Sequence, residues 1–185
     1  MRGFTTIELL VTIAVLAILA ALAGPSFTSL MERWRIRQAT EDLQGTLFLA
    51  RSEAIKRGGN VAIVKTGNGH GCANASTAAD WGCGWAVFVD TNGDGTLNTG
   101  ETILQQTAAP TRVEATLAEH GGSTSMQPVI KVDRWGMLND NSATDLVFRL
   151  KPQGKDVSDP AAASLCIYPG GQIKRLSTAT DACNN

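Results

Sequence analysis

Hydrophobic residues follow two patterns along this chain, and the pattern changes near residue 58. From Leu9 to Ala23 almost every position is apolar, which predicts a helix with apolar side chains on all sides, buried in lipid or against other helices. Further along, apolar residues recur at steps of three to five, mostly four, which indicates one apolar face of an α-helix. These residues are Leu30, Trp34, Ala39, Leu43, Leu47, Ala50 and Ala54.

The two patterns form one predicted helix from Phe4 to Arg57, and Gly58-Gly59 follows as its stop signal. Such a helix would be about 80 Å long at about 1.5 Å per residue. Pro25 lies inside it and removes one backbone hydrogen bond, so we expect a kink or a break there. We divide the helix into an apolar half, residues 4–24, and an amphipathic half, residues 25–57, which would pack on its own globular domain.

From Asn60 onward, short apolar runs alternate with clusters of Gly, Asn, Asp, Pro and Ser. This pattern is typical of strands separated by turns. The predicted strands are Val61–Val64, Trp85–Val89, Thr102–Leu104, Val113–Leu117, Val129–Val132, Leu146–Leu150, Leu165–Tyr168 and Ile173–Leu176. The expected fold is therefore α+β, with a long kinked helix packed on an antiparallel β domain of residues 58–185. The strand order does not follow from this pattern.

Composition and charge exclude some function classes. The formal net charge is −1, which gives no support for nucleic acid as the main partner. His70 and His120 are isolated in Gly-rich segments, and no serine, cysteine or acid arrangement offers a nucleophile with a base. We therefore predict that the protein is not an enzyme.

The four cysteines, Cys72, Cys83, Cys166 and Cys183, all lie beyond the apolar run. An even number of cysteines in an exported chain indicates disulfides. Three connectivities are possible, and pairing by neighbourhood gives Cys72–Cys83 and Cys166–Cys183. The alternative for Cys72 and Cys83 is a metal site with His70, although the spacing lacks the close cysteine pairs of zinc motifs.

The charged residue Glu8 sits where the apolar run begins. One interpretation is a secretory signal peptide with Ala21-Leu22-Ala23 as its cleavage site, but Glu8 interrupts the junction between the basic end and the apolar core. A second is a plain anchor, although the uninterrupted apolar run is shorter than the roughly 20 residues that a bilayer needs. A third is cleavage after Gly3, which would leave Glu8 facing the N-terminal amine of a neighbouring subunit, since an acid in an apolar helix usually has a cationic partner.

The N-terminal residues Gly3, Phe4, Thr5, Ile7, Glu8 and Leu9 resemble the leader of type IV prepilins and pseudopilins. The resemblance continues along the chain and favours the third interpretation. Residues 50–58 look like the end of the first helix in the FimT/FimU/GspH family of minor pilins and pseudopilins, and residues 85–90 look like that family's central hairpin. Arg134-Trp135-Gly136 falls where the family often has an aromatic residue and a glycine.

This resemblance implies a type IV pilin-like fold and a structural role. A prepilin peptidase would cut between Gly3 and Phe4, and the amine of Phe4 would be methylated. The helix would hold the subunit in the bacterial inner membrane by a single pass, with the C-terminal domain in the periplasm. It would then pack against other major and minor pilins, or pseudopilins, with Glu8 setting the register. We expect a minor pilin of a type IV pilus, located near the tip or initiation complex. One alternative is a GspH-like pseudopilin of a type II secretion system. The other is a FimT-like DNA-binding pilin for natural transformation.

The segment from Asp90 to Glu101 fits the twelve-position calcium-loop pattern, with Gly95 at the sharp turn. The alternative is an ordinary connection between strands, since such loops collect Asp, Asn and Gly, and strands rather than helices flank this one. Calcium is thus a candidate cofactor and not a required one. The candidate ligands are Asp90, Asn92, Asp94, Thr96, Asn98 and Glu101.

The basic residues Lys174 and Arg175 fall where some FimT-type pilins carry a Gly-Arg-x-Arg DNA-binding element. This chain departs from the element, because Gln172 replaces its first arginine and cannot neutralise a phosphate. We therefore favour a solvated edge strand over a DNA contact here.

Overall fold

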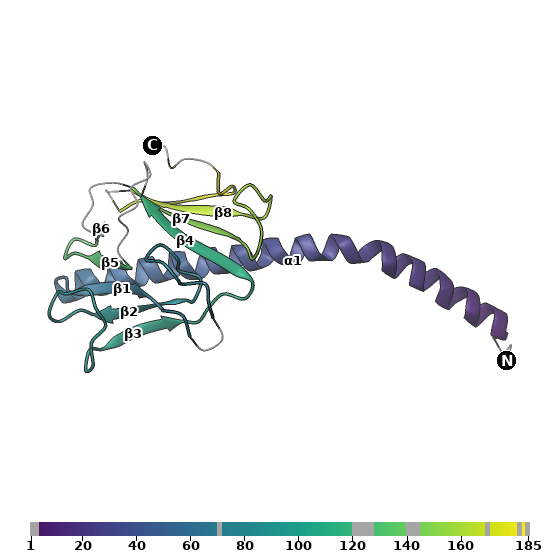
Figure 1. The fold of residues 1–185 in the computed structure, drawn as a ribbon, viewed down its shortest axis with the longest axis horizontal. Helices are drawn as coiled ribbons and strands as arrows, with labels where there is room; N and C mark the ends of the chain where they lie inside the picture. The colour runs from purple at the N-terminus through teal and green to yellow at the C-terminus, as the bar shows by residue number, and fades with distance from the viewer. Residues whose placement is uncertain are drawn as a thin grey trace.

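The computed structural model describes residues 4–69, 72–119, 128–139, 145–168, 171–180 and 183, and for residues 21–26 the backbone alone. One long helix, α1 (Thr6–Arg57), packs against two β-sheets, one drawn above it and one below it in Figure 1, and extends far beyond them. It continues unbroken through Pro25, and the part that leaves the sheets curves along its length. Gly58 ends the helix with a left-handed φ of 77°, a conformation that glycine adopts without steric cost.

The nine strands within the described residues form two antiparallel sheets. The first sheet has the order β3-β2-β1-β5-β6, and the second has the order β4-β7-β8-β9. Every pairing within them is antiparallel, which confirms the predicted α+β class. The strands are β1 (Val61–Lys65), β2 (Trp85–Val89), β3 (Ile103–Thr107), β4 (Val113–Glu119), β5 (Val129–Val132), β6 (Leu138–Asn139), β7 (Leu146–Pro152), β8 (Ala163–Ile167) and β9 (Ile173–Leu176).

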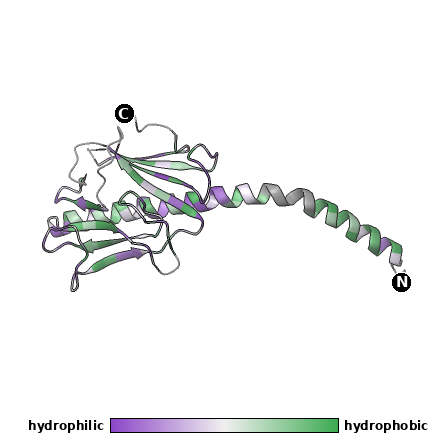
Figure 2. Ribbon diagram, viewed as in Figure 1, coloured by the Kyte–Doolittle hydropathy of each residue, from purple (hydrophilic) through white to green (hydrophobic). Residues whose placement is uncertain are grey.

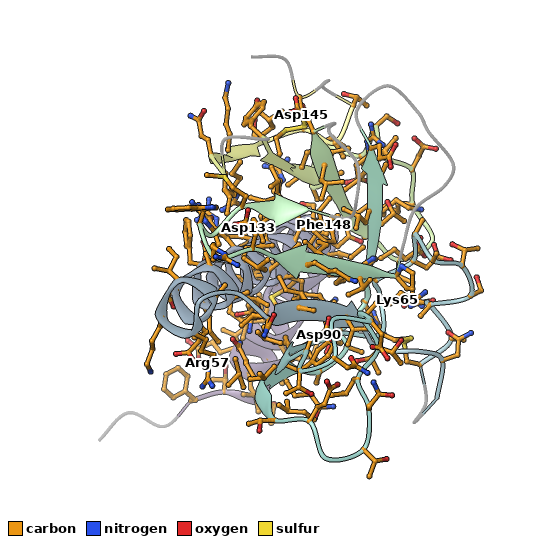
Figure 3. The ribbon with its side chains drawn as sticks, turned by 90° about the vertical axis from the view of Figure 1, so that its left-hand side faces the viewer. Arg57, Lys65, Asp90, Asp133, Asp145 and Phe148 are labelled. Atoms are coloured by element: carbon orange, nitrogen blue, oxygen red, sulfur yellow. A yellow bond between two sulfur atoms is a disulfide. The ribbon has the colours of Figure 1, made fainter. Side chains whose placement is uncertain are left out.

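The core lies between the inner face of α1 and both sheets. The helix contributes a buried row at steps of three and four, formed by Ile36, Ala39, Leu43, Leu47, Ala50 and Ala54. Above it, the rings of Trp81 and Phe148 meet edge to face with centroids 5.2 Å apart, and Figure 3 labels Phe148 among the interior side chains. The fully buried Trp85 donates its indole N–H to the hydroxyl of Thr46 on α1 at 2.9 Å.

Two of the helix residues predicted to pack on the domain do not. Trp34 is 58% exposed and Leu30 is 60% exposed, so the packing face begins at Ile36. Because 34 and 36 are two residues apart, about 200° around a helix with 3.6 residues per turn, Trp34 points away from the side that Ile36 buries.

Both short-range disulfides are present. Cys72 joins Cys83 in the connection between β1 and β2, and Cys166 of β8 joins Cys183 near the C-terminus. Pairing by neighbourhood was therefore right. The metal interpretation of Cys72 and Cys83 was wrong, because two sulfurs joined in a disulfide carry no thiolate to bind a metal. His70 and His120 lie outside the described residues.

Candidate functional site: the exposed half of α1

The half of α1 that extends beyond the sheets carries a bare apolar surface. Its large hydrophobic side chains expose between 50% (Val15) and 90% (Phe4) of their surface, and the ribbon of this part of the helix is mostly green, the hydrophobic colour, towards its N-terminus in Figure 2. An apolar surface of this extent marks a site of contact with a membrane or with other proteins. Its members are Phe4, Ile7, Leu9, Leu10, Val11, Ile13, Val15, Leu16, Ile18, Leu19, Phe27 and Leu30.

In the part of the chain that the structure describes, no helix meets the length and apolarity that crossing a membrane requires.

Glu8 takes part in the cap of this helix. Thr5 is the N-cap residue, and its hydroxyl accepts a hydrogen bond from the Glu8 N–H at 3.3 Å. In return, Oε2 of Glu8 accepts from the Thr5 N–H at 3.0 Å and from the Thr5 hydroxyl at 2.9 Å. This reciprocal pair is a capping box, which satisfies donors that the first turn of a helix leaves unpaired. The expectations drawn from the sequence did not include this cap, although the Thr-x-x-Glu spacing was a usable signal.

The expected cleavage site borders the start of α1. Gly3 lies outside the described residues, whereas Phe4 precedes the first helical residue, Thr6, and is 90% exposed. Among the described residues Glu8 forms no ion pair, and its Oε1 accepts no hydrogen bond. One carboxylate oxygen therefore holds the cap while the other is open to a partner.

The loop after β2 contains the candidate calcium ligands and closes on itself through hydrogen bonds. Asp90 accepts from the Gly95 N–H through Oδ2 at 2.9 Å, and Asp94 accepts from the Thr96 N–H at 2.7 Å and from the Asn98 amide at 3.0 Å. The Asn92 amide also donates to Asp94, and Glu101 accepts from the N–H groups of Thr91 and Asn98.

These hydrogen bonds hold the pKa of Asp94 and of Glu101 below their usual values, chiefly through the N–H of Thr96 and the N–H of Asn98 respectively. Within the described ranges, no group of three His, Cys, Asp or Glu side chains converges as a metal site. Oδ1 of Asp90 is buried and has no hydrogen-bond partner among the residues that the structure describes. Calcium binding by this loop stays a prediction.

The candidate DNA-binding residues lie on β9, one of the two edge strands of the second sheet. Both Lys174 and Arg175 are exposed. Arg175 faces Glu41 of α1, with its Nη1 3.5 Å from Oε1 of that carboxylate. The guanidinium is thus already opposed by an acid, which weakens its attraction for a phosphate. DNA binding stays a prediction that this arrangement does not favour.

A bare apolar half-helix, continuous with an amphipathic half that packs against antiparallel sheets, defines the class of type IV pilin-like filament subunits. Comparison with known proteins supports this class. The chain resembles two crystal structures of the type IV minor pilin FimU of Pseudomonas aeruginosa (strain PAO1). One match has 21% identity and a TM-score of 0.54 and covers 81% of this chain and 98% of that chain. The other has 23% identity and a TM-score of 0.55 and covers 83% and 96%.

The family model described as "Type II transport protein GspH" matches residues 39–171. The chain therefore belongs to the GspH family of minor pilins and pseudopilins, which confirms the family resemblance found in the sequence. A search of the curated proteins finds no match. The family is one of structural pilins, and membership implies assembly with other pilins in a pilus or pseudopilus filament.

Proposed function

We propose that this chain is a structural, non-enzymatic minor pilin of a type IV pilus, incorporated at or near the filament tip. A prepilin peptidase removes residues 1–3 and the amine of Phe4 is methylated. The apolar half of α1 then anchors the subunit in the bacterial inner membrane, with its globular domain in the periplasm, until the subunit enters the filament. The observation that carries this proposal is the bare apolar surface of α1, which the chain's own sheets leave uncovered.

The first experiment is the intact mass and N-terminal sequence of the protein from membranes of its native host. We expect a chain that begins at N-methylated Phe4. A chain that begins at Gly24 would mean an ordinary secreted protein, and the proposal would be overturned.

The second candidate function is a minor pseudopilin of a type II secretion system, and the family description favours it. Deletion of the gene separates the two. Loss of surface pili with normal export of secreted enzymes supports the pilus, whereas normal piliation with periplasmic retention of those enzymes supports the secretion system.

In either system we propose that Glu8 pairs with the N-terminal amine of a neighbouring subunit through its open Oε1. An unpaired carboxylate buried among helices would be costly, so the pairing would set the axial register. The capping box complicates the usual test, because Glu8→Ala removes the cap together with the charge.

Two conservative variants separate these roles. Glu8→Gln keeps a side chain that still fits a capping box but carries no charge, and Thr5→Ala removes the cap partner but keeps the charge. We expect Glu8→Gln to stay in the membrane fraction and to lose incorporation into sheared filaments, while Thr5→Ala incorporates. Normal incorporation of Glu8→Gln would refute the pairing role.

A further inference from the structure

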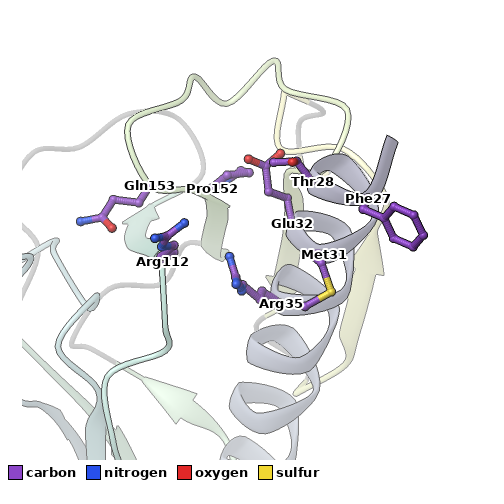
Figure 4. A pocket seen from close by; sticks show the side chains of 8 residues that line it. All are labelled: Phe27, Thr28, Met31, Glu32, Arg35, Arg112, Pro152 and Gln153. Atoms are coloured by element: carbon purple, nitrogen blue, oxygen red, sulfur yellow. The ribbon is translucent and has the colours of Figure 1, made fainter. Parts of the chain in front are cut away.

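A hollow of about 620 Å³ opens where α1 leaves the globular domain (Figure 4). One wall is the helix, and the other is formed by the residues just before β4 and at the end of β7. This volume is within the range of pockets that hold small ligands, roughly 300–1,000 Å³. The lining residues are Phe27, Thr28, Met31, Glu32, Arg35, Arg112, Pro152 and Gln153.

Two arginines face each other across this hollow. Figure 4 shows Arg35 reaching from the helix and Arg112 reaching from the opposite wall toward the same space. Arg112 adopts a φ of 56°, which is uncommon for a non-glycine residue. Its carbonyl accepts the Gln153 N–H at 3.0 Å, which holds this backbone in place beside β7.

The positive charge of the two guanidinium groups is not neutralised from within the hollow. Glu32 is the acid on its wall, and that carboxylate is engaged by Lys155 at 2.7 Å. Lys155 in turn contacts Asp159 at 3.3 Å. Across the described residues, neither Arg35 nor Arg112 has an ion pair or a side-chain hydrogen bond. Two converging, unpaired guanidinium groups favour an anion between them.

Guanidinium geometry points to a phosphate. The planar fork of arginine matches the oxygens of phosphates and can donate two parallel hydrogen bonds. A phosphodiester offers two non-ester oxygens, so each arginine can take one.

The place of the hollow along α1 indicates where such a phosphate would come from. The bare apolar surface continues past the apolar half of residues 4–24 and ends at Leu30. Twenty residues ending at Leu30 span about 30 Å, which is the thickness of a bilayer's hydrocarbon core. Arg35 lies five residues further, about 7.5 Å along the axis, and helix side chains lean toward the N-terminus. The headgroup layer adds roughly 5–7 Å on each side of the core, so the guanidinium of Arg35 would reach the level of the phosphates.

We propose that Arg35 and Arg112 bind the phosphate of an anionic phospholipid headgroup and so hold the globular domain against the membrane surface before assembly. This inference rests on the membrane-anchored stage of the proposed function. The headgroup enters from the lipid side of the hollow, between the helix and the start of β4. Extraction of the subunit into a filament then breaks these contacts.

Native mass spectrometry of the full chain in detergent tests the site. The probes are phosphatidylglycerol, phosphatidylcholine and inorganic phosphate. The test variant is Arg35→Gln with Arg112→Gln, and the control is Arg37→Gln with Arg134→Gln, which removes the same charge from exposed arginines outside this hollow. Thermal unfolding of all variants establishes that each is folded.

We expect the wild type and the control to retain phosphatidylglycerol, and the test variant to bind it at least about tenfold more weakly, the loss that corresponds to one charge-assisted hydrogen bond. Equal loss in the control would mean general attraction to a basic surface and would overturn the proposal. Full competition by inorganic phosphate would assign the site to a free anion. Unchanged lipid binding with lost filament incorporation in the test variant would assign it to an acidic neighbouring subunit. Both results would also overturn the proposal.

The failure of this inference differs from the failure of the proposed function. If the protein begins at Phe4 and stays in the membrane fraction but shows no preference for phosphatidylglycerol, the headgroup site alone is wrong. If the chain begins at Gly24, the membrane stage itself falls.

Discussion

Arg51 joins the helix to both sheets, and its replacement should show how much this one side chain stabilises the fold. Its Nε donates to the carbonyl of Gly136 at 2.8 Å, in the turn between β5 and β6 of the first sheet. Its Nη1 donates to the carbonyl of Gly171, next to β9 in the second sheet. Both glycines have left-handed φ values, of 76° and 75°. A Cβ on Gly171 would lie 2.7 Å from the Arg51 guanidinium.

The magnitude follows from the two hydrogen bonds. Each involves a charged donor, and such bonds contribute about 1.5–3 kcal/mol. Arg51 is half-buried, so water replaces part of the loss, and we expect Arg51→Ala to lower the free energy of unfolding by about 2–4 kcal/mol. For a chain of this size, each kcal/mol lowers Tm by about 2–4 °C.

Thermal and urea unfolding of the full chain in detergent measure this effect. Arg51→Lys keeps the charge but can reach one carbonyl, so about half of the loss should return. Arg57→Ala is the matched control, because Arg57 makes a 2.8 Å pair with Glu53 on the helix surface and such pairs contribute only about 0.3–0.5 kcal/mol. If Arg51→Ala is no more destabilising than Arg57→Ala, the joining role is refuted.

Three further predictions concern the β domain. Glu114 lies directly opposite Lys151 on β7, and its 2.7 Å contact with that lysine lowers the pKa of Glu114. The stability that this pair contributes should be present above pH 4.5 and be lost as the pH falls below it. In acid titrations, Glu114→Gln should therefore show a smaller loss of Tm over that window than the wild type. Reduction of the Cys166–Cys183 bond, which closes 17 residues, should cost about 3 kcal/mol, with Cys183→Ser reproducing the loss; an unchanged urea midpoint would contradict this. If the loop of Asp94 binds calcium, millimolar Ca²⁺ should raise Tm by mass action, and Asp94→Asn should abolish the shift; no shift in the wild type would end the calcium hypothesis.

Local periodicity was sufficient to predict most of the fold. The helix was predicted from Phe4 to Arg57 and runs from Thr6 to Arg57, and all eight predicted strands exist. Boundaries failed where polar residues continue a strand. β3 runs to Thr107 through Gln105 and Gln106 because it is an edge strand with partly exposed side chains. The two-residue strand β6 was missed, since it is too short to have a period.

Contacts between distant segments could not be predicted. Neither the order of strands in the two sheets nor the presence of Arg35 and Arg112 on one hollow leaves a signal in the local pattern, because both depend on how the chain returns to the helix. Trp34 is a case in which the local pattern predicted a contact that the fold does not make. It continues the apolar spacing of α1, yet it is exposed because it points away from the side of the helix that Ile36 buries against the sheets.

The exposed half of α1 explains why polar groups, rather than apolar ones, should determine whether the subunit stays in the membrane or enters the filament. Its twelve large exposed apolar side chains would each gain about 1.5–3 kcal/mol from full burial, so leaving them in water costs on the order of 20 kcal/mol. Lipid and neighbouring helices relieve this cost almost equally, since lipid tails are as apolar as leucine. Moving the subunit from membrane to filament is then nearly neutral for these residues. Under the two proposals, the direction and the register would come from charges at the two ends of the apolar surface: Glu8, paired with a neighbouring amine, and the arginine pair, which would give up its phosphate on extraction.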